Sequence, residues 1–119
     1  MAFLNEGFKV RGTVRDPDNE AKIAPLRVAF GEKFDQIELV RADLLDEESM
    51  LTALEGTQYV AHVASPFVLE EPSDENVLIK PAVDGTLGVL KACAKHGVKR
   101  VVLTSSVVAV MHTSPETKP

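Results

Sequence analysis

Strand-like and helix-like patterns alternate along this sequence. The strand-like segments are residues 8–15, 37–42, 59–64 and 100–104, and the helix-like segments between them are residues 19–27, residues 46–54 and a long stretch that ends at residues 96–97. In a strand–helix–strand unit the crossover is right-handed, so the strands run parallel and the helix lies over the sheet. The alternation therefore predicts a single α/β domain over residues 1–119, with a doubly wound parallel sheet.

The ends of the helices can be predicted from single residues. Asp46 is a suitable N-cap for a helix that runs through Leu54, and Gly56 is suited to stop it. Pro25 is expected to cut or kink the short helix before it. Pro81 is expected to bend the long helix or to mark its first turn.

Burial can be predicted from the apolar pattern. Residues 59–64 and 100–104 are apolar at nearly every position, which predicts strands buried on both faces. His62 and Cys93 are interpreted as core residues, a strand histidine and a buried helix thiol. On the long helix, one face is predicted to pack on the rest of the domain; it holds Val83, Leu87, Leu90 and Ala94.

Composition excludes several classes of function. The net charge is −5 without a basic cluster, so nucleic acid is not an expected partner. The apolar runs are too short to span a membrane, and residues 1–6 lack the features of a signal peptide. The single cysteine excludes an internal disulfide and fits a reducing compartment. We therefore expect a cytoplasmic protein that acts on small molecules, with no metal site.

Ligands of doubly wound sheets bind at the carboxyl ends of the strands, and the first such end carries positive charge. Arg15 follows the first strand directly, and Lys22 comes seven residues later. An acidic residue at this position would bond the ribose 2′-hydroxyl of NAD, whereas an arginine pairs with the 2′-phosphate of NADP. Two solvated surface cations would give the same pattern.

The other strand ends carry weaker signals. Asp43 and Leu44 end the second strand, where an aspartate is often a cap or turn former. Residues 63–66 end the third strand with small side chains, which would let a flat cofactor approach the backbone. Residues 104–106 end the last strand with hydroxyl groups suited to a substrate carbonyl, although serines are also common in turns.

Five segments together resemble the dihydroflavonol reductase and cinnamoyl-CoA reductase group of the extended short-chain dehydrogenases/reductases, within the NAD-dependent epimerase/dehydratase superfamily. They occur in the same order and at matching distances, and they cover nearly the whole chain. The resemblance implies an incomplete Rossmann-type fold and an NADP-dependent oxidoreductase with a small-molecule carbonyl substrate. The segments are Arg11–Pro17, Ala42–Asp46, His62–Phe67, Ile79–Thr86 and Val98–Ser106.

The resemblance also implies a role for individual residues. Arg15 and Lys22 would hold the 2′-phosphate of NADP. Asp43 and Leu44 would flank the adenine, with the Asp43 carboxylate accepting a hydrogen bond from its amino group. Ser106 would be the catalytic serine, donating a hydrogen bond to the substrate carbonyl. Three residues would line the path of the nicotinamide-side ribose and the pyrophosphate: Val63, Ala64 and Ser65.

Two motifs of the group have no counterpart in this sequence. No three glycines fit the glycine-rich phosphate loop, which should precede Arg15 by about one strand–turn–helix unit, and residues 1–7 are similar to the tail of the helix after that loop. The sequence also has no Tyr-x-x-x-Lys proton donor, because Val63 stands four residues after Tyr59, its one tyrosine. Ser106 would thus lack its general acid.

We therefore expect a fragment of an NADPH-dependent carbonyl reductase that is inactive by itself. A non-catalytic nucleotide-binding or assembly module is the alternative, and a fragment of a nucleotide-sugar epimerase or dehydratase is another. The missing first strand would lie between the strands that start at Phe8 and Tyr59. Its loss should leave a gap of roughly 10 Å between them and expose edges through which the chain could self-associate.

Overall fold

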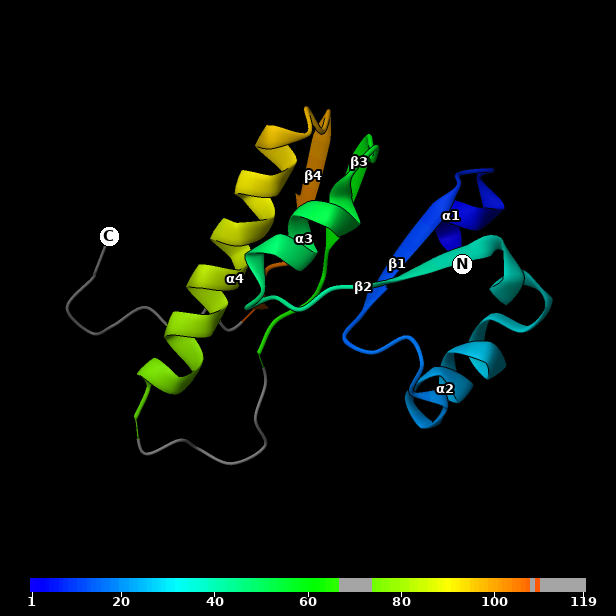
Figure 1. Ribbon diagram of the computed structural model, residues 1–119, viewed down its shortest axis with the longest axis horizontal. Coiled ribbons are helices and arrows are strands. Elements are labelled where there is room, and N and C mark those ends of the chain that lie inside the picture. Colours follow the sequence, from blue (N-terminus) through cyan, green and yellow to red (C-terminus); the bar gives the residue numbers. More distant parts are fainter. Residues whose placement is uncertain (67–73, 108, 110–119) are drawn as a thin grey trace.

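The computed structural model describes residues 1–66, 74–107 and 109 and contains two separate strand pairs (Figure 1). Strand β1 (Val10–Val14) pairs in parallel with β2 (Ile37–Arg41), in a register that sets Val10 opposite Ile37. Strand β3 (Tyr59–His62) pairs in parallel with β4 (Arg100–Leu103). The predicted incomplete Rossmann-type α/β fold is confirmed, and β1 and β3 share no ladder, in agreement with the gap expected between them.

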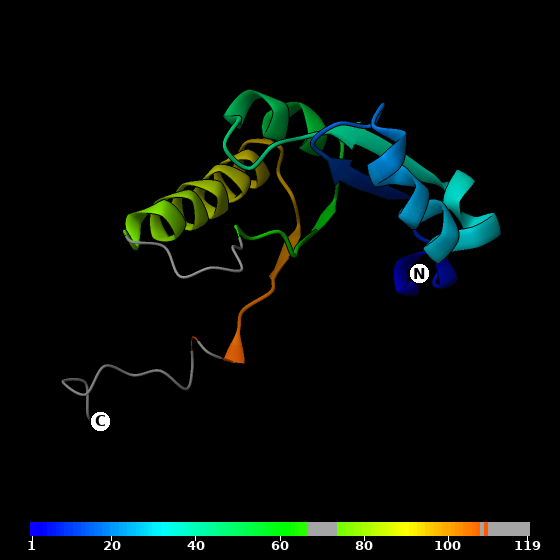
Figure 2. The same ribbon diagram turned by 90° about the horizontal axis from the view of Figure 1, so that it is seen from below.

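The helices fall where the alternation places them. The described elements besides the strands are α1 (Ala2–Asn5), α2 (Glu20–Phe30), the short 3-10 helix η1 (Gly31–Gln36), α3 (Glu47–Leu54) and α4 (Asn76–Lys95). Figure 2 shows the β1–β2 pair with α1 and α2 on one side of the molecule and the β3–β4 pair with α4 on the other. No helix in the described ranges combines the length and apolarity needed to cross a membrane.

Local capping explains the helix ends. Asp46 accepts a hydrogen bond from the amide of Ser49 and begins α3, as predicted, and Gly56 follows the helix with a φ of +72°, a conformation that favours glycine. Asn19 caps α2 in the same way. Of the two predicted effects of Pro25, a cut is wrong, because α2 continues to Phe30, and a kink stays a prediction. A proline removes one backbone donor, and the capped helix tolerates that loss.

The main core lies between α3, α4 and the β3–β4 pair. It contains seven buried residues, and Val60 and Val101 of the strands pack against it. The predicted burial of His62 and Cys93 is confirmed. The buried residues of this core are Ala42, Met50, Ala53, Leu54, Val89, Ala92 and Cys93.

The prediction that β3 and β4 are buried on both faces is wrong. Tyr59 of β3 is 55% exposed and Val102 of β4 is 58% exposed, whereas Val60 faces the core. Both strands are also shorter than predicted and end at His62 and Leu103. The helices of the described residues cover one face of this pair, so the apolar side chains of the second face remain in solvent.

The prediction of which face of α4 packs on the domain is also wrong. Val83, Leu87, Leu90 and Ala94 are exposed, and Pro81 lies inside the helix, past its first turn. The residues that are buried instead are Gly85, Val89, Ala92 and Cys93. Small residues let the helix approach closely: a Cβ added at Gly85 would lie 3.1 Å from the Cβ of Leu44. The helix is apolar on two sides, and the side with the small residues packs.

Polar and aromatic contacts join the β1–β2 pair to α3 and to β3. Arg11 of β1 donates hydrogen bonds from Nη1 to the carbonyl oxygens of Ala53 (3.0 Å) and Glu55 (2.8 Å), at the end of α3. Phe8, just before β1, lies edge-on to the ring of Tyr59 in β3, with centroids 6.2 Å apart. Both contacts lie near the starts of the strands, and Val40 of β2 and the following Ala42 also pack with the main core.

Candidate functional site

Two unpaired cations lie at or near the connection between β1 and α2. Arg15 follows the last residue of β1, and Lys22 lies in the first turn of α2. Both are exposed, and neither side chain has a hydrogen bond or ion pair with the residues that the structure describes. Unpaired cations at the carboxyl end of a parallel strand can bind an anionic ligand group without first breaking an internal contact.

The turn after β2 brings Asp43 close to Arg15 along the sheet edge. Val14 lies opposite Arg41 in the register, and the amide of Ala42 donates to the carbonyl of Val14 at 2.8 Å. The next residues in each strand therefore share the carboxyl end of this pair. Arg15, Asp43 and Leu44 thus follow the same end of this strand pair, and their roles stay a prediction.

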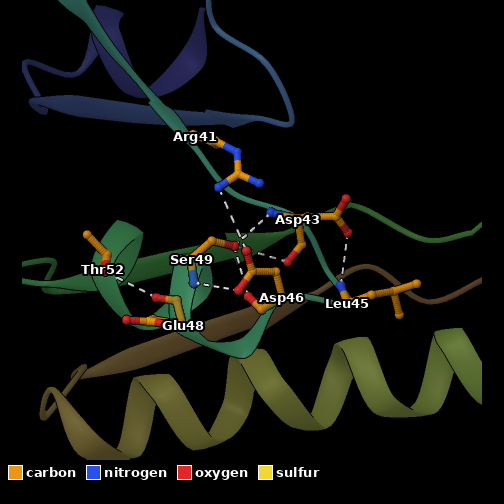
Figure 3. Close-up of polar contacts among 7 residues, drawn as sticks. All are labelled: Arg41, Asp43, Leu45, Asp46, Glu48, Ser49 and Thr52. Atoms are coloured by element: carbon orange, nitrogen blue, oxygen red, sulfur yellow. Dashed lines mark hydrogen bonds and ion pairs between the residues drawn. The ribbon is translucent and has the colours of Figure 1, made fainter.

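The backbone around Asp43 is held by a network that Figure 3 shows. Asp43 Oδ1 accepts a hydrogen bond from the amide of Leu45 at 3.0 Å, which leaves Oδ2 without a hydrogen bond in the described part of the chain. The hydroxyl of Ser49 accepts from the Asp43 amide at 3.0 Å and donates to the carbonyl of Asp46 at 2.8 Å. One carboxylate oxygen of Asp43 is therefore fixed and the other can accept from a ligand.

Ser49 is a positioning residue that the sequence reasoning missed. Its side chain joins the turn at Asp43 to the first turn of α3, and its amide bonds to Asp46 Oδ1 at 3.1 Å. The available signal was the spacing: a hydroxyl three residues after an N-cap aspartate stands where it can reach back to the preceding turn.

The remaining predicted residues lie at the carboxyl end of the other pair. His62 is opposite Leu103, and the amide of Thr104 donates to the carbonyl of His62 at 3.0 Å. Residues 63–65 and residues 104–106 each follow one strand of this pair, and all of them are exposed. Val63, Ala64, Ser65 and Ser106 thus follow the strands of the β3–β4 pair, whereas Arg15 follows β1 and Lys22 lies in α2.

Two cavities adjoin Leu44. One, of about 480 Å³, is lined by the turn after β2 and the exposed side of α4, including Lys80, Asp84 and Lys91. The other, of about 330 Å³, lies between β1 and β3 and brings Leu44 together with Val63 and Ala64. The second cavity therefore connects the two groups of predicted site residues.

Burial shifts the pKa values of two ionisable groups in opposite directions. Desolvation lowers the pKa of His62, because burial disfavours the imidazolium form. Desolvation raises the pKa of the Cys93 thiol for the same reason. Neutral His62 and protonated Cys93 fit the core roles that the sequence predicts for them.

The residues present fit one end of a phosphorylated dinucleotide. Arg15, Lys22 and the second oxygen of Asp43 offer two cations and an acceptor for a 2′-phosphate and an adenine amino group. The seven glycines of this sequence do not form the glycine-rich loop that would hold the pyrophosphate. Within the described ranges, no group of three or more His, Cys, Asp or Glu side chains is placed to hold a metal ion.

Comparison with known proteins decides the family. The 3-beta hydroxysteroid dehydrogenase/isomerase family matches residues 11–117. The chain belongs to this family. Anthocyanidin reductase of Arabidopsis thaliana is 44% identical over 109 residues, which are 91% of this chain and 32% of that protein. Tetraketide alpha-pyrone reductase 1 of the same plant is 48% identical over 105 residues, 87% of this chain and 32% of that protein.

Solved structures of other reductases have a similar fold. Yeast methylglyoxal/isovaleraldehyde reductase Gre2, complexed with NADPH, matches with a TM-score of 0.71 and 31% identity over 91% of this chain and 33% of its own. Vestitone reductase from alfalfa matches with a TM-score of 0.63 and 32% identity over 91% of this chain and 31% of its own. The predicted resemblance is confirmed, and the chain spans about a third of the length of the curated relatives that it matches first.

Proposed function

We propose that this chain supplies the adenosine end of the NADPH site in a carbonyl reductase of the family. The parent reaction is hydride transfer between NADP and a small aldehyde, ketone or flavonoid-like carbonyl. The observation that carries the proposal is the unpaired, exposed guanidinium of Arg15 at the end of β1, beside Asp43. The names of the relatives support it, since they are reductases and one was solved with NADPH.

In this proposal, the carboxyl ends of the two strand pairs bind different parts of the cofactor and substrate. Arg15 and Lys22 bind the 2′-phosphate, and the free oxygen of Asp43 accepts from the adenine amino group. The bound cofactor supplies the hydride. Residues 63–65 line the path of its ribose and pyrophosphate, and the Ser106 hydroxyl donates to the substrate oxygen as negative charge develops there.

The chain alone is expected to turn over no substrate. Reduction of a carbonyl leaves an alkoxide that needs a proton, and the sequence has no Tyr-x-x-x-Lys pair to supply it. Purified residues 1–119 should oxidise no more NADPH in the presence of an aldehyde than the Ser106→Ala variant does. Turnover clearly above that variant would contradict the proposed division of the catalytic groups.

Recognition of the 2′-phosphate can be tested on the chain itself. Adenosine 2′,5′-bisphosphate should bind more tightly than adenosine 5′-monophosphate in a calorimetric titration. Arg15→Ala should reduce that preference about 10- to 100-fold, because a charge-assisted hydrogen bond contributes roughly 1.5–3 kcal/mol. Lys9→Ala is the matched control, since Lys9 is an exposed cation next to the opposite end of β1. Equal effects of the two variants would contradict the assignment of Arg15.

A further inference from the structure

The connection from β1 to α2 is fixed at both of its ends. At the strand end, the carbonyl of Val14 accepts a hydrogen bond from the amide of Ala42 at 2.8 Å. At the helix end, Ile23 is buried in the protein and is 2% exposed. Arg15 and Lys22 lie between these two anchors. The backbone of residues 15–22 therefore decides how far apart the two cations stand.

A tight turn shapes the middle of this connection. The amide of Asn19 donates to the carbonyl of Asp16 at 3.4 Å, and the turn lies between them. An aspartate is favoured at the first position of such a turn and a proline at the second, which Pro17 occupies. Asp16 Oδ1 also accepts a hydrogen bond from the amide of Asp18 at 3.1 Å. The Asp16 side chain thus holds the turn that directly follows Arg15.

A second side chain continues these hydrogen bonds into α2. Asn19 Oδ1 accepts from the amide of Lys22 at 3.3 Å, and the Asn19 carbonyl accepts from the same amide at 2.9 Å. The Asn19 carbonyl also accepts from the amide of Ile23 at 3.1 Å. The backbone of Lys22 is therefore held by Asn19, whose own amide is held by Asp16.

The charge of Asp16 is unfavourable for the ligand that the two cations are proposed to bind. Asp16 and Asp18 are exposed carboxylates in the same turn, and a carboxylate near a phosphate repels it. The Asp16 carboxylate accepts a hydrogen bond, whereas that of Asp18 accepts none from the residues that the structure describes. One aspartate thus combines a charge with a structural hydrogen bond, and the other carries the charge alone.

We propose that Asp16 and Asn19 are positioning residues for recognition of the 2′-phosphate, and that they hold Arg15 and Lys22 at the spacing from which both cations reach one phosphate group. The inference rests on the proposed function, because it assumes that these cations bind that phosphate. Neither positioning side chain needs to contact the ligand. Asp16 acts through its acceptor oxygen, so its hydrogen bond and its charge have opposite effects on binding.

Substitution can separate the hydrogen bond of Asp16 from its charge. The measured quantity is the ratio of the affinities for adenosine 2′,5′-bisphosphate and adenosine 5′-monophosphate, from calorimetry on residues 1–119. A variant that only lowers the folded fraction weakens both ligands equally and leaves this ratio unchanged. Asp16→Ala should lower the ratio about 3- to 10-fold, because the open turn must then be ordered when the phosphate binds. Asp16→Asn keeps an acceptor oxygen without the charge, so its ratio should equal or exceed that of the unaltered chain.

Asp18→Ala is the matched control for the charge. It removes a carboxylate of the same turn and no hydrogen bond, so the ratio should stay unchanged or rise. At the start of α2, Asn19→Ala should lower the ratio, whereas Asn19→Ser should keep most of it, because serine also caps helices.

The outcomes distinguish this inference from the proposed function. No preference for the bisphosphate in the unaltered chain, or a preference that Arg15→Ala leaves intact, would overturn both. If Arg15→Ala removes the preference but Asp16→Ala leaves it intact, or if Asp16→Ala and Asp18→Ala lower it equally, the positioning role alone is overturned. A loss of preference in Asp16→Asn equal to that in Asp16→Ala would show that the charge acts and would also overturn the positioning role.

Discussion

The two strand pairs differ in how they are held, although both are parallel pairs with one open inner edge. The β3–β4 pair lies against α3 and α4 and the seven-residue core between them. In the half that contains the β1–β2 pair, three further residues are buried outside that core: Leu4 of α1, Ile23 of α2 and Phe34 of η1. Arg15 and Lys22, the cations predicted to select the cofactor, belong to this half, which has fewer buried residues. The comparison indicates that one half of the chain carries most of its stability and the other most of its proposed specificity.

Truncation of core residues should affect the two halves differently. Leu54→Ala removes a side chain of the main core and should cost about 2–5 kcal/mol of the free energy of unfolding, with loss of amide protection throughout the chain. Ile23→Ala, at a residue 2% exposed, should cost a similar amount but loosen the β1–β2 half alone. Denaturant titration and hydrogen exchange measure the two effects. Equal loosening of both halves by Ile23→Ala would show that they are a single cooperative unit.

Cofactor preference should depend on the thinly packed half. In a longer protein that carries the missing segments, Arg15→Ala should lower the NADPH/NADH ratio of kcat/KM about 10- to 100-fold, equivalent to roughly 1.5–3 kcal/mol. The variant should leave activity with NADH nearly unchanged. Steady-state kinetics with both cofactors would test this, and an unchanged ratio would refute the role of Arg15.

The polar contact between the halves should contribute less. Arg11→Met keeps the length of the side chain but leaves the carbonyls of Ala53 and Glu55 without their donor, at a cost of about 1–3 kcal/mol. Arg27→Met is the control, because the exposed Arg27–Glu20 pair should contribute about 0–1 kcal/mol. If chemical denaturation gives the same loss for both, Arg11 does not join the halves.

The smallest expected effect is the pH dependence from His62. Its pKa is lowered in the folded chain, so the unfolded chain binds more protons near the ordinary histidine pKa of about 6.5. Stability should therefore be unaffected above that pH and fall as the pH decreases through it. His62→Gln should reduce this slope in thermal unfolding between pH 7.5 and 5.5. A slope that the substitution does not change would assign the pH dependence to other groups.

Local features of the fold could be predicted from single residues. Asp46 and Gly56 delimit α3 as expected, because capping and left-handed glycines depend on a few neighbouring atoms. The turn at Asp43 was also expected, but the role of Ser49 was not, because it depends on which backbone atoms the folded turn brings within reach.

Burial could not be predicted in the same way. The apolar pattern of β3 and β4 reports that both faces can pack, but not that the described residues cover one face. On α4 the larger residues Leu87 and Leu90 are exposed while Gly85 and Ala92 are buried, because close approach of the helices depends on small side chains. Such outcomes depend on the partners that each face meets, and a one-dimensional pattern does not contain them.

The open edges of β1 and β3 are the central claim, and neighbouring amides within each strand test it most directly. Gly12 and Val60 point their N–H groups toward β2 and β4, whereas Thr13 and Ala61 point theirs toward the cavity between β1 and β3. Hydrogen exchange of monomeric residues 1–119, resolved by residue, should show protection at Gly12 and Val60 and fast exchange at Thr13 and Ala61. Equal protection of all four amides in the monomer would show that β1 and β3 are already paired, and would contradict the account.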